Sequence, residues 1–223
     1  MCGRFTITLE PAFFQQELDL GNLPSEWVPR YNAAPGQSIP VVRETKSRDV
    51  AMLLWGLVPF WAKDISIGYK LINARSETLL EKPSFKNAFK NRRCLILADG
   101  FYEWQQPTVK GAPKAPFRFT LKGGKPFAFA GLWESWRSPE NEEIQSCTII
   151  TCEPNPLLAQ IHNRMPVILD RNNCWEWLED KPDNKLFELL RPYPAESMAG
   201  YPVGQAVNNP RVDEFDLIKP LEI

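Results

Sequence analysis

The chain has 223 residues, a hydrophobic fraction of 43% and a formal net charge of −1. This length can bury a sizeable core and the composition is that of a packed globular protein; with no membrane-length apolar stretch and no signal-peptide pattern, we expect a cytoplasmic protein without a membrane partner. Five cysteines without a C-x-x-C pair and a single histidine argue against both a disulfide framework and a metal site.

The pattern of apolar and turn residues predicts strands through the middle of the chain and short helices around them. A first strand runs through Phe5 and Ile7, and clearer strands are expected at 51–61, 93–104, 116–121, 126–136, 146–152 and 165–170. The glycines of KGGKP (122–126) predict a hairpin turn, because glycine accepts positive φ. Short helices are expected at 11–18, 84–91, 155–162, 174–180 and 184–191. With no βαβ alternation, the prediction is an α+β fold in a single domain (1–223), with a mostly antiparallel, barrel-like β-sheet and short peripheral helices.

Charge is unevenly distributed along the chain. Residues 63–93 hold eight Lys or Arg against three Asp or Glu, whereas residues 134–190 hold five against eleven. Two solvated surfaces would explain this distribution, and so would one basic face for a polyanion. The distribution alone does not separate them.

A cysteine directly follows the initiator methionine. Once Met1 is removed, Cys2 carries a thiol and an α-amine on neighbouring carbons, with unperturbed pKa values of about 8.5 and about 7.7–8.0. A free thiol at a terminus is an oxidation liability with little packing value. The alternative is an accident of the reading frame, in which Cys2 only starts the first strand.

Two polar segments offer groups for proton transfer and phosphate binding. In INAR (72–75), Asn73 offers a donor and an acceptor and Arg75 can bind a phosphate; a helix-start turn capped by Ser76, with Arg75 on the surface, explains them equally well. In ADGFYEW (98–104), Glu103 lies among aromatic residues, which raises the pKa of a carboxyl and suits a general acid or base. A Glu on the wet face of an edge strand is the alternative.

Three further features have a functional and a structural interpretation. His162 in IHNRMPVIL (161–169) either interacts with the last carbonyls of a helix or exchanges a proton near neutral pH. Phe60 and Trp61 either plug the core or stack on unpaired bases beside lysines. Arg4 is either a phosphate contact or a surface charge.

The ordered set of motifs resembles the SOS-response-associated peptidase (SRAP) family. The segments that carry this resemblance are MCGRF (1–5), RYNAAPGQ (30–37), WGLVPFWAKD (55–64), INARSET (72–78), CLILADGFYEW (94–104), FAFAGLWESW (127–136), TIITCEPN (148–155) and IHNRMPVIL (161–169). The resemblance runs from residue 1 to about 169, with a weaker match at 201–213.

The resemblance implies a sensor of abasic sites in single-stranded DNA that crosslinks covalently to the lesion. It implies that Cys2, freed by removal of Met1, forms an imine and then a thiazolidine with the sugar aldehyde, without a cofactor or metal. It further implies that Asn73 orients the amine, that Glu103 moves protons, and that His162 promotes opening of the sugar ring.

For DNA binding, the resemblance implies phosphate contacts and a wedge against the bases that flank the lesion. The residues are Arg4, Arg75 and Arg164 for phosphates, with Phe60 and Trp61 as the wedge. We expect a monomer whose partner is single-stranded DNA containing abasic sites, nucleoid-associated if the source is bacterial; the sequence identifies no replication partner. The family name also implies autoproteolytic peptidase activity, although a generic aminopeptidase would suffice to remove Met1.

Two other functions fit parts of the sequence. An MCG terminus also opens class II glutamine amidotransferases, in which an N-terminal cysteine attacks an amide, but that interpretation requires an accompanying synthase or transferase domain. A non-catalytic single-stranded nucleic-acid binder would use the basic 63–93 segment and its aromatic residues, and its binding would be reversible and independent of Cys2. A stable adduct with damaged DNA separates the SRAP interpretation from both.

Overall fold

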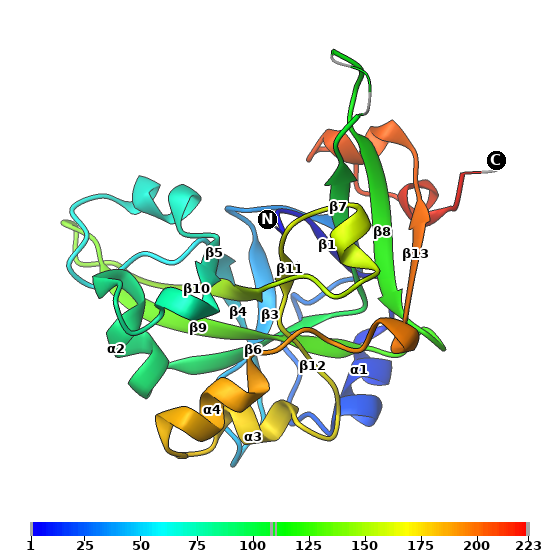
Figure 1. Ribbon diagram of the computed structural model, residues 1–223. Helices are drawn as coiled ribbons and strands as arrows, with labels where there is room; N and C mark the ends of the chain where they lie inside the picture. The colour runs from blue at the N-terminus through cyan, green and yellow to red at the C-terminus, as the bar shows by residue number, and fades with distance from the viewer. Residues whose placement is uncertain (1, 108, 110, 222–223) are drawn as a thin grey trace.

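The structure, a computed structural model, describes residues 2–107, 109 and 111–221, whose strands form two sheets (Figure 1). The five-stranded sheet has the order β13 (Met198–Pro202), β8 (Ala115–Leu121), β7 (Gly100–Gln105), β1 (Phe5–Ile7) and β2 (Arg30–Ala33). The eight-stranded sheet has the order β11 (Met165–Pro166), β10 (Glu143–Cys152), β4 (Val50–Trp55), β3 (Ser38–Val42), β6 (Arg93–Ala98), β9 (Phe127–Arg137) and β12 (Ile168–Leu169), with β5 (Asn73–Arg75) beside β10.

The larger sheet closes on itself. Strand β10 pairs with β9 on one side and with β4 on the other, so β10, β4, β3, β6 and β9 form a closed five-stranded barrel. The β10–β4 and β10–β5 pairs are parallel and the other strand pairs are antiparallel. Closure removes the exposed edges that an open sheet would present. The predicted α+β fold with a mostly antiparallel, barrel-like sheet is therefore confirmed.

The segment 93–104, predicted as one strand, is instead two strands in different sheets. Strand β6 ends at Ala98 in the barrel and β7 begins at Gly100 in the five-stranded sheet. Asp99, at the break, is buried, and its carboxylate accepts hydrogen bonds from the Thr6 hydroxyl (2.6 Å) and the Leu9 backbone N–H (2.8 Å). Asp99 therefore links the junction between the two sheets to the end of β1.

The α-helices are short and peripheral, as predicted, with changes at their ends. They are α1 (Pro11–Leu18), α2 (Pro83–Asn91), α3 (Cys174–Leu178) and α4 (Asp183–Leu189), and 3₁₀ turns cover 65–70, 76–78, 158–160, 195–197, 205–208 and 215–218. The predicted helix 155–162 is wrong, because only a 3₁₀ turn forms there. Asn155 fixes that turn by accepting from the Leu158 N–H (2.9 Å) and donating to the Tyr193 carbonyl (2.7 Å).

Two further strand predictions change and one turn prediction is confirmed. The strand predicted at 51–61 ends at Trp55, because Gly56 turns the chain with φ of 130°. The strand predicted at 165–170 is interrupted at Val167, which hydrogen-bonds to β10 through its N–H and to β9 through its carbonyl. In the hairpin turn, Gly123 and Gly124 have φ of 83° and 65°, as predicted.

Figure 1 shows where these elements place the start of the chain. Helices α1, α3 and α4 lie on the lower side of the barrel, whereas the N-terminus lies on the upper side between β1 and β7. In the antiparallel register of this pair, Phe5 lies opposite Phe101 and Thr6 opposite Gly100. Continuing that register places Gly3 opposite Glu103, so the fold brings the first residues of the chain to the predicted acid–base carboxyl.

The buried Asp99 network predicts a large loss of stability on truncation. Asp99→Ala leaves the buried Arg118 guanidinium without its carboxylate partner (3.4 Å) and the turn after β1 without its acceptor. We expect the free energy of unfolding to fall by about 3–5 kcal/mol, the usual cost of breaking a buried ion pair. Urea denaturation measures this change. Glu188→Ala, which removes an exposed pair with Lys185, is the control and should unfold close to wild type; equal midpoints for both variants would contradict the assignment.

Candidate active site

Cys2 lies at the start of β1, in the interior between the two sheets. Its side chain is fully buried, and its Sγ is 3.8 Å from the carbonyl oxygen of Arg4. Burial and the neighbouring Glu103 charge raise the pKa of the thiol far above its usual value. The thiol therefore stays protonated at neutral pH until a base removes its proton.

Asn73 meets Cys2 from the other sheet. It lies on β5 opposite Ile149 of β10, and its Nδ2 donates to the Cys2 carbonyl (2.9 Å). Its Oδ1 is buried and has no hydrogen-bond partner among the described residues. Leaving such an acceptor unpaired costs about 1–3 kcal/mol, so a ligand group is expected there. An amine at Cys2 would suit this acceptor. Ser76 begins a 3₁₀ turn after Asn73 rather than capping a helix.

Glu103 supplies a titratable carboxyl at the same place. Only 2% of its surface is exposed, which contradicts the alternative of a wet edge-strand face. Burial raises the pKa of its carboxyl from the ordinary value near 4.5 to about 7. The carboxyl therefore populates both protonation states at neutral pH, as a group that both accepts and donates protons must.

His162 follows the 3₁₀ turn at 158–160, beside the end of β7. Gln105 of β7 donates to the carbonyl of Gln160 (3.3 Å), which holds this turn against the strand. The His162 Nδ1 lies 3.1 Å from the backbone nitrogen of Arg164 and 3.3 Å from its carbonyl oxygen, so the Arg164 backbone fixes the orientation of the ring. Burial lowers the pKa of the imidazole, which favours its neutral form at pH 7.

Two of the three predicted phosphate-binding arginines are engaged with the protein itself. Arg164 binds both carboxylate oxygens of Glu77 (2.5 and 2.9 Å) and the Thr151 carbonyl (2.6 Å). Arg4 donates to Val207 and Asn32, as described below. Arg75 is exposed at the end of β5. Phosphate binding stays a prediction for all three, and in this structure Arg75 has the most accessible side chain.

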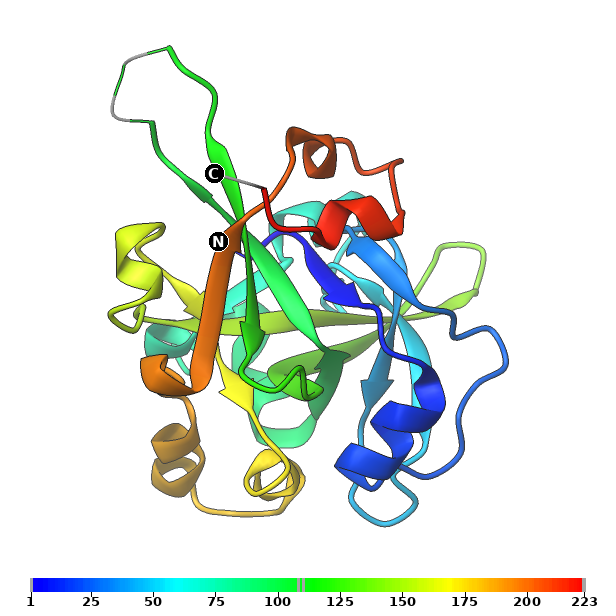
Figure 2. The same ribbon diagram turned by 90° about the vertical axis from the view of Figure 1, so that its right-hand side faces the viewer.

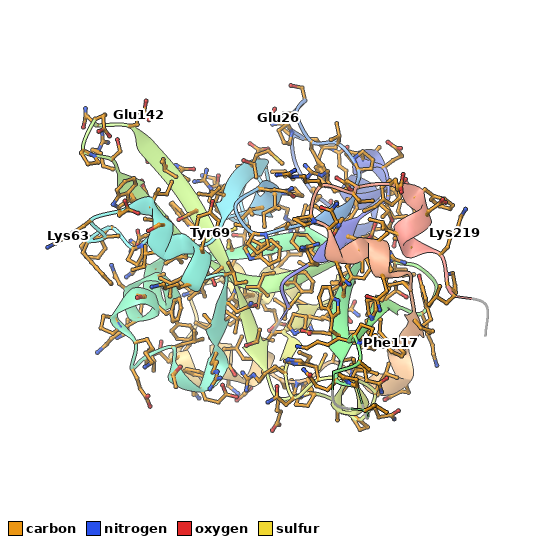
Figure 3. All side chains as sticks on the ribbon, turned by 90° about the horizontal axis from the view of Figure 1, so that it is seen from above. Glu26, Lys63, Tyr69, Phe117, Glu142 and Lys219 are labelled. Carbon is orange, nitrogen blue, oxygen red and sulfur yellow. The ribbon has the colours of Figure 1, made fainter. Side chains whose placement is uncertain are left out.

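The aromatic residues predicted to contact bases are on the surface. Phe60 is 60% exposed and Trp61 47%, which contradicts the alternative of a plug in the core. Trp61 lines a pocket of about 370 Å³ together with Lys63 and Lys70. In Figure 3, Lys63 marks the far edge of this segment, and Tyr69 lies closer to the middle of the molecule.

Sequence analysis missed several residues that shape this site. Tyr69 is 68% exposed, and its ring lies so close to Gly36 that a Cβ there would be 3.1 Å from the ring. Asn32, fully buried on β2, and Glu77, which pairs with Arg164, were also missed. Asn32 and Glu77 lie inside the motif segments 30–37 and 72–78, which were the available signal for them. For Tyr69, the signal was an aromatic residue beside Lys70.

Two negative findings concern the described residues. Within residues 2–107, 109 and 111–221, no group of three or more His, Cys, Asp or Glu side chains is arranged to hold a metal ion. Within the same residues, no helix is both long and apolar enough to cross a membrane.

Comparison with known proteins identifies the family. The family model described as SOS response associated peptidase (SRAP) matches residues 1–210. The chain is 46% identical to abasic site processing protein YoqW of Bacillus subtilis (strain 168), over 98% of this chain and 99% of that protein. It is 32% identical to abasic site processing protein HMCES of Gallus gallus, over 100% of this chain and 79% of that protein.

Solved structures agree with these sequence matches. A crystal structure of a protein from Bordetella bronchiseptica superposes with a TM-score of 0.80 at 27% identity, covering 91% of this chain and 100% of that one. A protein from Bacteroides thetaiotaomicron superposes with a TM-score of 0.78 at 28% identity, covering 86% and 85% of the two chains. Since the family model spans most of the chain and relatives match it along nearly all of its length, the chain belongs to the SRAP family.

Proposed function

We propose that this protein captures abasic sites in single-stranded DNA as a covalent adduct of Cys2. The observation that carries the proposal is the meeting of three groups in the interior: the Cys2 thiol, the Asn73 Oδ1, which has no hydrogen-bond partner among the described residues, and the Glu103 carboxyl with its pKa of about 7. The printed names of the relatives, abasic site processing proteins, support the choice of substrate.

The proposed reaction needs an amine and a thiol on neighbouring carbons, which Cys2 supplies once Met1 is removed. The ring-opened abasic sugar presents an aldehyde at C1′. The α-amine attacks this carbon, and the carbonyl oxygen takes up protons and leaves as water, which yields an imine. The thiol sulfur then adds to the imine carbon and its proton passes to the nitrogen, closing a five-membered thiazolidine. These steps involve no net oxidation or reduction. Ring closure is favoured because the second nucleophile is part of the same residue and lies close to the imine carbon.

Three side chains have complementary tasks in this sequence. Glu103 accepts a proton from the amine or the thiol and returns one to the departing hydroxyl, because its pKa of about 7 permits both directions. His162 transfers a proton at the sugar ring oxygen, with its imidazolium as the acid, which promotes ring opening. The Asn73 Oδ1 accepts from the amine of Cys2 and directs its lone pair.

The proposed DNA path runs over the exposed aromatic segment. Phe60 and Trp61 stack on unpaired bases, worth about 1–3 kcal/mol per base, and Arg75 contacts a phosphate. The lysines that line the pocket beside Trp61 add to the electrostatic attraction. We propose that the protein acts as a monomer. Its autoproteolytic activity, implied by the family description, is proposed only for removal of residues ahead of Cys2.

Cys2→Ala separates covalent capture from reversible binding. We expect this variant to form no adduct while keeping most of its DNA affinity, because phosphate and stacking contacts do not involve the thiol. A denaturing gel with single-stranded DNA bearing one abasic site measures the adduct, and fluorescence anisotropy measures the affinity. Undamaged DNA is the control. An adduct that persists in Cys2→Ala would point to another nucleophile.

Glu103→Gln tests the proton-transfer step. The amide keeps the size of the side chain but has no titratable proton, so we expect crosslinking at saturating DNA to slow by about 10²-fold or more. DNA affinity should be unchanged. Single-turnover rates between pH 6 and 8 should lose the wild-type inflection near pH 7. A variant with the wild-type rate and profile would remove Glu103 from the mechanism.

Glu103→Gln, which should slow crosslinking, should also change how the stability of the protein depends on pH. The folded-state pKa of Glu103 lies above its ordinary value, so burial penalises the charged form. Wild-type stability should therefore fall as pH rises from about 4.5 through about 7, whereas Glu103→Gln lacks this loss. The shift corresponds to about 3 kcal/mol, and thermal unfolding at pH 5 and pH 8 compares the two proteins. A gap between their melting temperatures that stays constant with pH would contradict the raised pKa.

A further inference from the structure

The segment 203–213, which we call the clasp, follows β13 and lies beside the start of β1 and along β2 (Figure 2). It carries a second apolar cluster, separate from the main core, in which Val203 and Val207 are fully buried against Tyr102 of β7. The N-terminal end of the clasp is anchored because the preceding strand, β13, pairs with β8. The clasp is therefore a fixed part of the fold.

The clasp is tied to β2 by two side chains. Asn32 is fully buried, and its Nδ2 donates to the carbonyls of Asn209 (3.0 Å) and Val212 (2.8 Å). Asp213 at the end of the clasp accepts from the backbone N–H groups of Tyr31 (2.6 Å) and Asn32 (3.0 Å), and from Arg30 Nε (2.5 Å). The two side chains thus connect the same two segments: Asn32 donates from β2 to the clasp, and Asp213 of the clasp accepts from β2.

Arg4 connects the clasp to the nucleophile. Its Nη1 donates to the Val207 carbonyl (2.7 Å) and to Asn32 Oδ1 (2.9 Å), and its Nη2 donates to the Asn208 carbonyl (3.3 Å). The backbone carbonyl of the same residue accepts from the Tyr102 N–H (3.0 Å) and lies 3.8 Å from the Cys2 Sγ. One residue therefore links the clasp, the thiol and strand β7.

The clasp also fixes both neighbours of the acid–base carboxyl. Tyr102 packs in the clasp cluster, and its hydroxyl donates to the Tyr31 carbonyl (2.8 Å). Trp104 donates from Nε1 to Asn208 Oδ1 (2.7 Å). Glu103 lies between these two residues, so the backbone that carries it is held on each side.

We propose that Asn32 and Asp213 are positioning residues for covalent capture: through the clasp they hold Arg4, and with it the Cys2 thiol, in register with Glu103. The inference rests on the proposed function and adds residues that contact neither DNA nor the reacting atoms. Their effect is geometric. A displacement of about 1 Å between reacting groups can slow a reaction by about 10²-fold, whereas DNA binding at the exposed aromatic segment does not depend on that register.

The experiment compares four Met-trimmed proteins: wild type, Asn32→Ala, Asp213→Asn and Asp216→Asn. The last is the matched control, because Asp216 makes the same kind of carboxylate–cation pair in the same C-terminal region, with Lys219 (2.6 Å). Single-turnover crosslinking at saturating abasic DNA gives the rate, and anisotropy with undamaged single-stranded DNA gives the affinity. Circular dichroism establishes that each protein is folded.

We expect the maximal crosslinking rate to fall by about tenfold or more in Asn32→Ala, and by a smaller factor in Asp213→Asn, with DNA affinity unchanged. Asp216→Asn should match wild type in both. Rates at the wild-type level in Asp213→Asn would overturn the proposal. Equal losses of rate and affinity would also overturn it, since they would place DNA contacts on the clasp. If Asn32→Ala does not fold, Asp213→Asn decides alone.

A second probe distinguishes failure of this inference from failure of the proposed function. Propanal condenses with an N-terminal cysteine to a thiazolidine with loss of water, and intact mass records the gain. If wild type forms no adduct with abasic DNA, the proposed function fails, and the propanal rates of the four proteins then test the positioning. Slower reaction in Asn32→Ala and Asp213→Asn supports the proposal, and equal rates in all four contradict it.

Discussion

The geometry of the site depends on how Asp99 joins the two sheets. Its carboxylate lies between the barrel strand β6 and strand β7, and it binds the Thr6 hydroxyl and the backbone beyond β1. Since β1 is three residues long, its ladder alone would fix its register weakly. With Asp99 at one end and Arg4 at the other, β1 is fixed at both ends. The position of Cys2 relative to the barrel follows from those two polar contacts.

The burial that forms the core also shifts the pKa values of two titratable side chains in the site. Excluding water from Glu103 penalises its charged form and raises its pKa, and excluding water from His162 lowers the pKa of its imidazole. The two shifts run in opposite directions because one group is anionic and the other cationic when ionised. A carboxyl that is easily protonated and an imidazole that stays neutral suit exchange of protons with an uncharged aldehyde and its imine.

The sequence predicted local elements well and long-range contacts poorly. Helix 11–18 and the Gly123–Gly124 turn follow from local rules, as does the barrel-like sheet from repeated β-branched segments. The run 93–104 contains the turn dipeptide Asp99-Gly100, but the prediction joined the two strands because apolar residues continue on both sides of it. The motif resemblance identified Cys2, Asn73 and Glu103, which the structure brings together. The weaker motif match at 201–213 covers the clasp, but its contact with Arg4 could not be predicted, since Val207 and Asn208 lie about two hundred residues away from Arg4.

The arginines divide the site into a rigid part and an exposed part. Arg4 donates hydrogen bonds to a backbone carbonyl, and Arg164 donates to a backbone carbonyl and to Glu77. These contacts hold the segments that carry Cys2 and His162. Arg75 and the aromatic pair at 60–61 instead face solvent. In the proposed site, the rigid groups set the distance between the nucleophile and the acid–base side chain, whereas the exposed groups can adapt to any nucleobase beside a lesion. In the proposed function, chemistry and DNA recognition are therefore assigned to different side chains, so that contacts with bases can vary while the geometry around the aldehyde stays fixed.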